Sequence, residues 1–328
     1  MSSLSFAHSA VYVSNKSIRH EHMGQIRIGA GGWDYFSIPH GDRLKAYSSA
    51  FSFVEVNSTY YHLPSSAMVT SWRRRVPSGF EFSVRCQKDL VELHGLEPTR
   101  ESLRIISSLE TICRRLRASV MTMLVPRRIS EGKEFSRKLD TFLSTISLGH
   151  ARLALEFRGG EPTEDTLKLL HDHGSLHSVD ISNQDPKLGS NLLYSRLFGK
   201  GRENVYEFDD NELRGIAAKA EDPEFEKSIL AFHGVRMYRD AARLKTFLNT
   251  GKFPAITGQI GLESLGEVLR EDASFPTSRA ELIGGQGWKL YDKTPEERQR
   301  IGVVLKKLPD RTYVTIDEVL SSLRATAL

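Results

Sequence analysis

The chain has 328 residues, of which 39% are hydrophobic and 26% charged, and its formal net charge is +4. These values are typical of a soluble protein with one large domain and a small one, and they exclude a membrane-spanning segment, because no apolar run approaches roughly 20 residues. The small basic excess permits an anionic partner but does not require one.

The only cysteines are Cys86 and Cys113. They fit neither a metal-binding spacing nor a disulfide framework, which favours a reducing, cytoplasmic location. Residues 1–23 are Ser-rich and lack the apolar block of a secretory signal. We interpret them as a loose N-terminal leader, with Met23 as an alternative start.

Short β-rich segments alternate with helical segments along most of the chain. Eight strands are expected at 26–29, 53–57, 80–85, 120–125, 152–157, 177–181, 192–198 and 228–233. Helices are expected at 44–51, 67–75, 100–116, 135–146, 164–173, 211–220 and 241–249, with an irregular gap after the sixth strand. This order predicts an α/β fold, a (β/α)8 TIM-type barrel. A doubly wound sheet is the alternative, but Gly29-Ala30-Gly31-Gly32-Trp33 lacks the spacing of a phosphate-binding loop.

The pattern changes near Asp272, where three further helices are expected at 278–284, 295–308 and 316–323. Thr294-Pro295-Glu296-Glu297 has the features of a helix start, with proline at the first helical position. We therefore predict a barrel domain over residues 24–272 and a small helical C-terminal domain over 273–328, which docks on the barrel because alone it would be marginally stable.

Charged residues occupy the strand positions that face a barrel interior. Glu55 and Asn57 alternate with valines, and Glu156 and Arg158 alternate with Leu155 and Phe157. The same alternation turns Asp180 and His233 inward. Interior charge is costly unless it is paired or used, so the strand ends are the place to look for function.

Several of these segments resemble the domain of unknown function 72 family, the YecE-like proteins. The resemblance covers roughly residues 25 to 255. It is carried by Gly29-Ala30-Gly31-Gly32-Trp33, Val54-Glu55-Val56-Asn57-Ser58-Thr59-Tyr60-Tyr61, Pro77-Ser78-Gly79-Phe80, Leu155-Glu156-Phe157-Arg158, Val179-Asp180 and Arg196-Leu197-Phe198-Gly199. It implies a TIM-type barrel but supplies no reaction. Two departures are Arg85, where the family usually has lysine, and Phe232-His233-Gly234, where it usually has an Asn-rich strand end.

In this fold the active site lies at the carboxyl ends of the strands. The candidate catalytic residues there are Glu156, Asp180 and His233. The candidate substrate-binding residues are Trp33, Asn57, Tyr60, Arg85, Arg158 and Arg196. One hypothesis makes Glu55, Glu156, Asp180 and His233 ligands of a divalent metal ion that activates water for hydrolysis.

A second hypothesis needs no metal: the arginines grip a phosphate or carboxylate, and Glu156 or Asp180 transfers a proton. A third is an internal salt-bridge network without chemistry, in which Arg27, Arg158 or Arg196 satisfies the carboxylates. This third hypothesis is favoured for Glu55 and Arg27, low in the barrel.

Two functions follow. The first is a hydrolase or lyase acting on an anionic substrate, such as a phosphate ester, a nucleotide or a nucleic acid. The alternative is a non-catalytic protein that binds an anion or a nucleic acid, with the C-terminal helices recruiting a partner. Its outer nucleic-acid surface would use Arg127-Arg128, Lys306-Lys307 and the arginines near Trp72. No membrane partner is expected, and the oligomeric state is left open.

Overall fold

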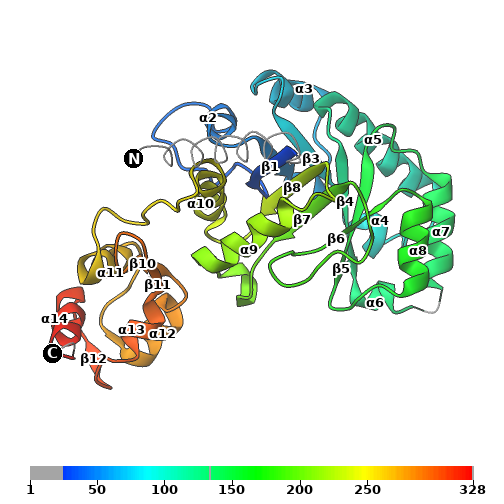
Figure 1. Cartoon of the computed structure of the whole chain (residues 1–328). Coiled ribbons are helices and arrows are strands. Elements are labelled where there is room, and N and C mark those ends of the chain that lie inside the picture. Colours follow the sequence, from blue (N-terminus) through cyan, green and yellow to red (C-terminus); the bar gives the residue numbers. More distant parts are fainter. Residues whose placement is uncertain (1–24, 133, 327–328) are drawn as a thin grey trace, which may run out of the picture. The chain divides into compact units, whose positions relative to one another are not determined.

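Eight parallel strands form one sheet that closes almost completely into a barrel, in a computed structural model that describes residues 25–132 and 134–326 (Figure 1). The strand order is β6-β5-β4-β3-β2-β1-β8-β7. A parallel bridge between Val179 and Ser195 links the end of β6 to β7. The strands are β1 (Gln25–Ala30), β2 (Phe53–Val56), β3 (Glu81–Arg85), β4 (Val120–Pro126), β5 (Arg152–Arg158), β6 (Leu176–Ser178), β7 (Leu192–Leu197) and β8 (Lys227–Phe232). The predicted TIM-type barrel is confirmed, whereas the predicted leader lies outside the described residues.

Helices follow the strands as predicted, and α3, α5, α7 and α8 lie outside the sheet (Figure 1). In α5 the residues Ile106, Leu109, Cys113 and Leu116 recur at helical spacing and are buried against the strands. The helices are α2 (Arg43–Ala50), α3 (Ser66–Arg74), α4 (Asp89–Glu92), α5 (Arg100–Leu116), α6 (Arg127–Ser130), α7 (Phe135–Thr145), α8 (Glu164–Asp172), α9 (Asp210–Ala220) and α10 (Met237–Thr250). No helix in the described part of the chain is long and apolar enough to cross a membrane.

Near the amino-terminal ends of the strands the barrel interior is apolar, and charged residues close it at that end. Phe53, Val120, Ala154, Leu176, Tyr194, Ile229 and Ala231 form a buried cluster. On the amino-terminal side, Glu81 pairs with Arg27 at 3.5 Å and with Lys227 at 2.5 Å. Arg27 on β1 thus pairs with Glu81 on β3, two strands away in the sheet, whereas Glu55 pairs with Arg196. The internal ion pairs expected for Glu55 and Arg27 are therefore present.

The chain divides into two compact units, and each is described by itself. The first contains the described residues up to Arg196 together with Ala218–Ala231, and the second contains Leu197–Ala217 and Phe232 onward. The domain boundary predicted near Asp272 stays a prediction. Within the second unit, α11 (Gly261–Arg270), β9 (Thr277–Ser278), α12 (Arg279–Gln286), β10 (Leu290–Asp292), β11 (Arg298–Arg300), α13 (Ile301–Leu305), β12 (Thr312–Tyr313) and α14 (Ile316–Thr326) surround one apolar cluster that includes Leu265, Leu305 and Leu323.

One predicted helix of this segment, 295–308, is largely wrong. The Thr294 hydroxyl accepts hydrogen bonds from the backbone of Glu296 and Glu297, as a helix cap would. The chain then turns back instead, and β11 pairs antiparallel with β10. The backbone N–H of Lys293 donates to the Glu297 carbonyl at 2.9 Å and closes this hairpin. Helix α13 begins only at Ile301.

A buried histidine in β6 gives the fold a testable pH dependence. The Nδ1 atom of His177 accepts a hydrogen bond from the backbone N–H of Lys187 at 3.2 Å. Burial, and next the Lys187 charge, lower the pKa of His177 to about 4, against an opposing effect of Glu161. An unfolded histidine takes up a proton near pH 6.5. The unfolded chain thus binds more protons between pH 6.5 and 4, so stability falls as pH falls through this window.

We expect His177 to remove about 2 kcal/mol of stability between pH 7.5 and pH 5. Asparagine at this position retains an acceptor near Nδ1 but does not titrate, so the His177→Asn variant should lose about this much less on acidification. Urea unfolding at the two pH values measures it. The control His171→Asn changes an imidazole that is 71% exposed and should behave like the parent. Equal acid sensitivity of parent and His177→Asn would contradict the prediction.

Candidate active site at the barrel mouth

A buried arginine joins two carboxylates inside the barrel. Arg196 on β7 donates from Nε and Nη2 to the two oxygens of Glu55, each at 3.0 Å. Its Nη1 atom donates to Glu156 on β5. Arg158, two residues further along β5, pairs with the other oxygen of Glu156. The side-chain exposure rises from 0% at Glu55 and 3% at Arg196 to 11% at Glu156 and 42% at Arg158. The network thus runs from the barrel interior to its mouth.

Two hydroxyl groups complete the buried end of this network. Tyr194 donates to Glu55 at 2.7 Å, and the Ser83 hydroxyl lies 2.7 Å from the Tyr194 oxygen. Burial, and next the Glu55 charge, raise the pKa of Tyr194, so the phenol remains a donor. Burial opposes the charge of Arg196, but Glu55 and Glu156 outweigh it and raise the pKa of the guanidinium. Arg196 is therefore a permanent cation between two anions.

Arg85 at the end of β3 is held by three residues that follow β2. Its Nη1 atom donates to the Asn57 side-chain oxygen at 2.6 Å, and its guanidinium lies 3.7 Å from the centre of the Tyr60 ring. The Thr59 hydroxyl lies 2.7 Å from the Val56 carbonyl and 2.6 Å from the Arg85 carbonyl. This links the ends of the two strands. Burial, and next the like charge of Arg196, lower the pKa of Arg85, so an anion at the mouth would relieve repulsion.

Two further candidate residues of the first unit, Asp180 and Trp33, are each held by a contact of their own. Asp180 follows β6, and its carboxylate accepts from the backbone N–H of Ser182 at 3.0 Å and from its hydroxyl at 2.6 Å. This carboxylate therefore closes a turn as well as lying near a strand end. Trp33 follows β1 and packs edge-to-face on Trp72 with ring centroids 5.3 Å apart, which anchors the β1–α2 loop on α3.

In the part of the chain that the structure describes, the residues predicted to bind a metal ion are not grouped as a ligand set. Among residues 25–132 and 134–326, no group of three or more His, Cys, Asp or Glu side chains is placed to hold a metal ion. Glu55 and Glu156 instead bind Arg196. His233 belongs to the second unit, where its ring stacks on Phe198 with centroids 4.8 Å apart. Arg196 donates to the carboxylates of Glu55 and Glu156, and its expected role in anion binding stays a prediction.

The fold defines a TIM-type barrel protein, and ionised side chains of its strands lie in the interior and at the mouth of the barrel. A sequence model of the family described as "Protein of unknown function DUF72" matches residues 27–258, and the chain belongs to this family.

Solved structures agree with the fold. Two crystal structures of a DUF72 family protein from Enterococcus faecalis V583 are similar to this chain, each with 16% sequence identity. The structure at 2.52 Å resolution has a TM-score of 0.54 and covers 70% of this chain and 98% of its own, and that at 3.10 Å has 0.56, 69% and 96%. No curated protein matches the chain. The comparisons therefore support the barrel fold and indicate no reaction.

Proposed function

We propose that this protein is a hydrolase or lyase that acts on a phosphate-bearing or otherwise anionic substrate at the barrel mouth, with Glu156 as the proton-transfer group. The observation that supports it is the position of Glu156 between two guanidinium groups. Arg196 holds one carboxylate oxygen from below and Arg158 holds the other from the mouth. A general base needs a fixed carboxylate within reach of substrate, and this network fixes it.

Substrate binding is assigned to Arg158 and Arg85. The Arg158 side chain is 42% exposed, so it can form hydrogen bonds to an incoming anion while keeping its contact with Glu156. Arg85 is oriented by Asn57 and Tyr60. A planar guanidinium group can donate two parallel hydrogen bonds to two oxygens of a phosphate or a carboxylate. Asp180, held by Ser182, is the second candidate for proton transfer.

The two thiols have no part in this proposal. Cys86 and Cys113 are buried and form no disulfide. Burial, and next the Glu110 charge, raises the pKa of Cys113 to about 12, and burial likewise raises the pKa of Cys86. Neither is an activated nucleophile. Unpaired buried thiols fit a reducing, cytoplasmic compartment, which we include in the proposal.

The test is a turnover screen of the full chain against phosphate monoesters, phosphodiesters and nucleotides, followed by kinetics of Arg158→Gln. We expect this variant to raise the KM of an anionic substrate roughly ten- to a hundredfold, because a hydrogen bond to a charged group contributes about 1.5–3 kcal/mol. The control Arg137→Gln changes an exposed arginine of α7 that pairs with Glu134 and should leave KM unchanged. Equal KM values for the two variants would exclude Arg158 from the binding site. Binding without turnover in the parent would favour the non-catalytic alternative.

A further inference from the structure

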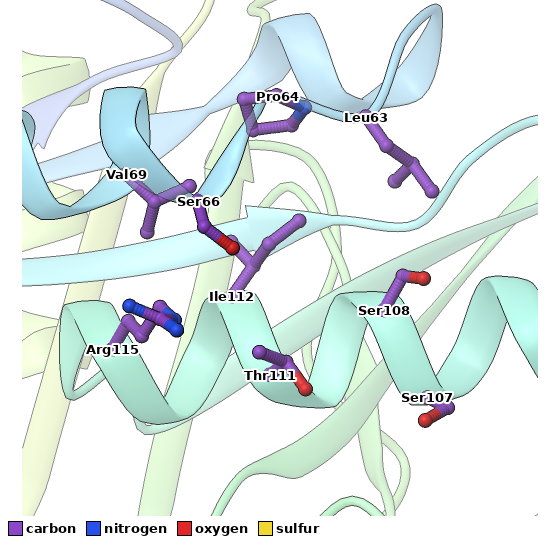
Figure 2. Close-up of a pocket in the computed structure, with 9 residues that line it drawn as sticks. All are labelled: Leu63, Pro64, Ser66, Val69, Ser107, Ser108, Thr111, Ile112 and Arg115. Atoms are coloured by element: carbon purple, nitrogen blue, oxygen red, sulfur yellow. The ribbon is translucent and has the colours of Figure 1, made fainter.

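An elongated groove runs between α3 and α5 on the outside of the barrel. It consists of two adjoining hollows of about 240 and 430 Å³ that share Ser66 and Arg115. In Figure 2 the side chains of Ser107, Ser108, Thr111 and Arg115 follow α5, opposite Ser66 and Val69 on α3. The second hollow continues along α3 past Thr70 and Ser71 to Arg74 and Arg75.

The polar part of the groove lining consists of arginines and hydroxyl groups and contains no carboxylate, and it lies beside apolar side chains, which are those of Leu63, Pro64, Ala67, Val69 and Ile112. Arg75 is paired with Asp42 at 3.1 Å. Within the described part of the chain, Arg74 and Arg115 form no ion pair, and Arg115 donates to the Thr70 hydroxyl at 3.2 Å. Both arginines are exposed. The groove thus presents two guanidinium groups without a protein counter-charge.

Arg73 has a different role. Its Nη1 atom donates to the Phe80 carbonyl at 2.7 Å, and its Nη2 atom donates to the Pro77 carbonyl, which ties the end of α3 to the turn before β3. Burial, and next the like charge of Arg117, lower the pKa of Arg73. The cationic excess therefore extends around the arginine end of the groove, which strengthens its attraction for a polyanion.

We propose that the groove binds the phosphate backbone of a nucleic-acid strand. Guanidinium and hydroxyl groups are the side chains that contact phosphate and sugar oxygens. No aromatic side chain lines either hollow, so bases have no stacking platform there and the binding is independent of sequence. A ligand with a single phosphate would occupy only one of the two hollows. Thr70, Ser71, Arg74 and Arg75 extend the groove along α3, whose axis is about 13 Å long, and this length suits a ligand with repeated phosphates.

This site is separate from the carboxylates and arginines of the barrel mouth. It shares no lining residue with the Glu156 network. It also contains only first-unit residues, so Lys306 and Lys307 of the second unit are not needed. The groove can therefore bind nucleic acid whether or not the proposed enzyme activity exists, and the two proposals fail independently.

The test is fluorescence anisotropy of the full chain with labelled single-stranded DNA and RNA oligonucleotides at several salt concentrations. The double variant Arg74→Glu/Arg115→Glu should weaken binding at least tenfold at low salt. Each single change to alanine should lower the slope of log affinity against log salt by about 0.7, as expected for loss of one contact to a single strand. The matched control Arg137→Glu reverses an exposed charge on α7 and should retain binding close to that of the parent.

Three outcomes would overturn the proposal. One is equal affinity of the double variant and the Arg137→Glu control, with thermal melts showing that both are folded. Another is displacement of the oligonucleotide by inorganic phosphate at matched phosphate concentration, which would indicate a site for a single phosphate. The third is loss of binding in Arg158→Gln, which would place the oligonucleotide at the barrel mouth. Unchanged affinity in Arg158→Gln supports the groove.

Discussion

Replacing Arg196 with methionine should lower the free energy of unfolding by about 3–5 kcal/mol, the cost of leaving buried charges without their partner. The Arg196 side chain is 3% exposed and binds both Glu55 and Glu156. Methionine fills much of the same volume but supplies no positive charge. Glu55, with 0% side-chain exposure, would keep only the Tyr194 hydrogen bond among the three described here. Urea unfolding at pH 7.5 measures the loss.

Two comparisons separate the charge effect from a packing effect. Arg158→Met removes the outer guanidinium of the same network, which is 42% exposed, and should cost no more than about 1 kcal/mol because water replaces the contact. The double variant Glu55→Gln/Arg196→Met removes one anion together with the cation and should recover part of the loss, as a coupling in a double-mutant cycle. If the loss in Arg196→Met were no larger than in Arg158→Met, the network would not be a stabilising element.

The strand positions of the network were predictable from alternation alone. Glu55, Glu156 and Arg158 each face inward because their neighbours are apolar residues that pack under helices. The partners were not predictable, because pairing depends on how far the tilted strands are staggered around the barrel. Arg196 therefore looked like a substrate ligand, whereas in the structure it binds Glu55 and Glu156.

Two members of the network were missed, although the same signal was present. Tyr194 lies two residues before Arg196, and Ser83 two residues before Arg85, so both share the inward parity of predicted site residues. Neither carries a formal charge, so the pattern of interior charge does not indicate them. Uncharged hydroxyls at such positions are worth including, because buried carboxylates need donors.

The C-terminal segment shows where local signals are insufficient. Thr294 does act as a cap, but the chain continues as a hairpin, because β11 pairs with β10. Conversely, α11 was not predicted. It begins after Ile260, which provides no side-chain cap, and its first residue, Gly261, has a φ of +64°. The apolar spacing of Leu265, Val268 and Leu269 was the only signal for it. For both the hairpin and α11, contacts with other parts of the chain outweighed the local sequence signals.

Replacing Glu156 with glutamine should lower kcat by about two to four orders of magnitude, the usual contribution of a general acid or base. The amide keeps the size of the side chain and an oxygen that can accept from Arg196, but it cannot take up a proton. KM should change less, since Arg85 and Arg158 remain. The measurement is kcat at saturating substrate, with a urea titration showing that the variant is folded.

The matched control is Glu55→Gln, which makes the same chemical change one layer deeper, where the side chain is 0% exposed. Glu55 also binds Arg196, so this variant should lose stability, yet its carboxylate cannot touch a substrate and its kcat should fall far less. The two variants therefore distinguish a positioning role, expected for Glu55, from a catalytic role, expected for Glu156. The pH profile adds a second readout: a limb of kcat that depends on an ionised carboxylate should disappear in Glu156→Gln and persist in Glu55→Gln. If kcat of Glu156→Gln were within about threefold of the parent, well short of the two orders of magnitude expected of a general base, proton transfer would have to be assigned to Asp180.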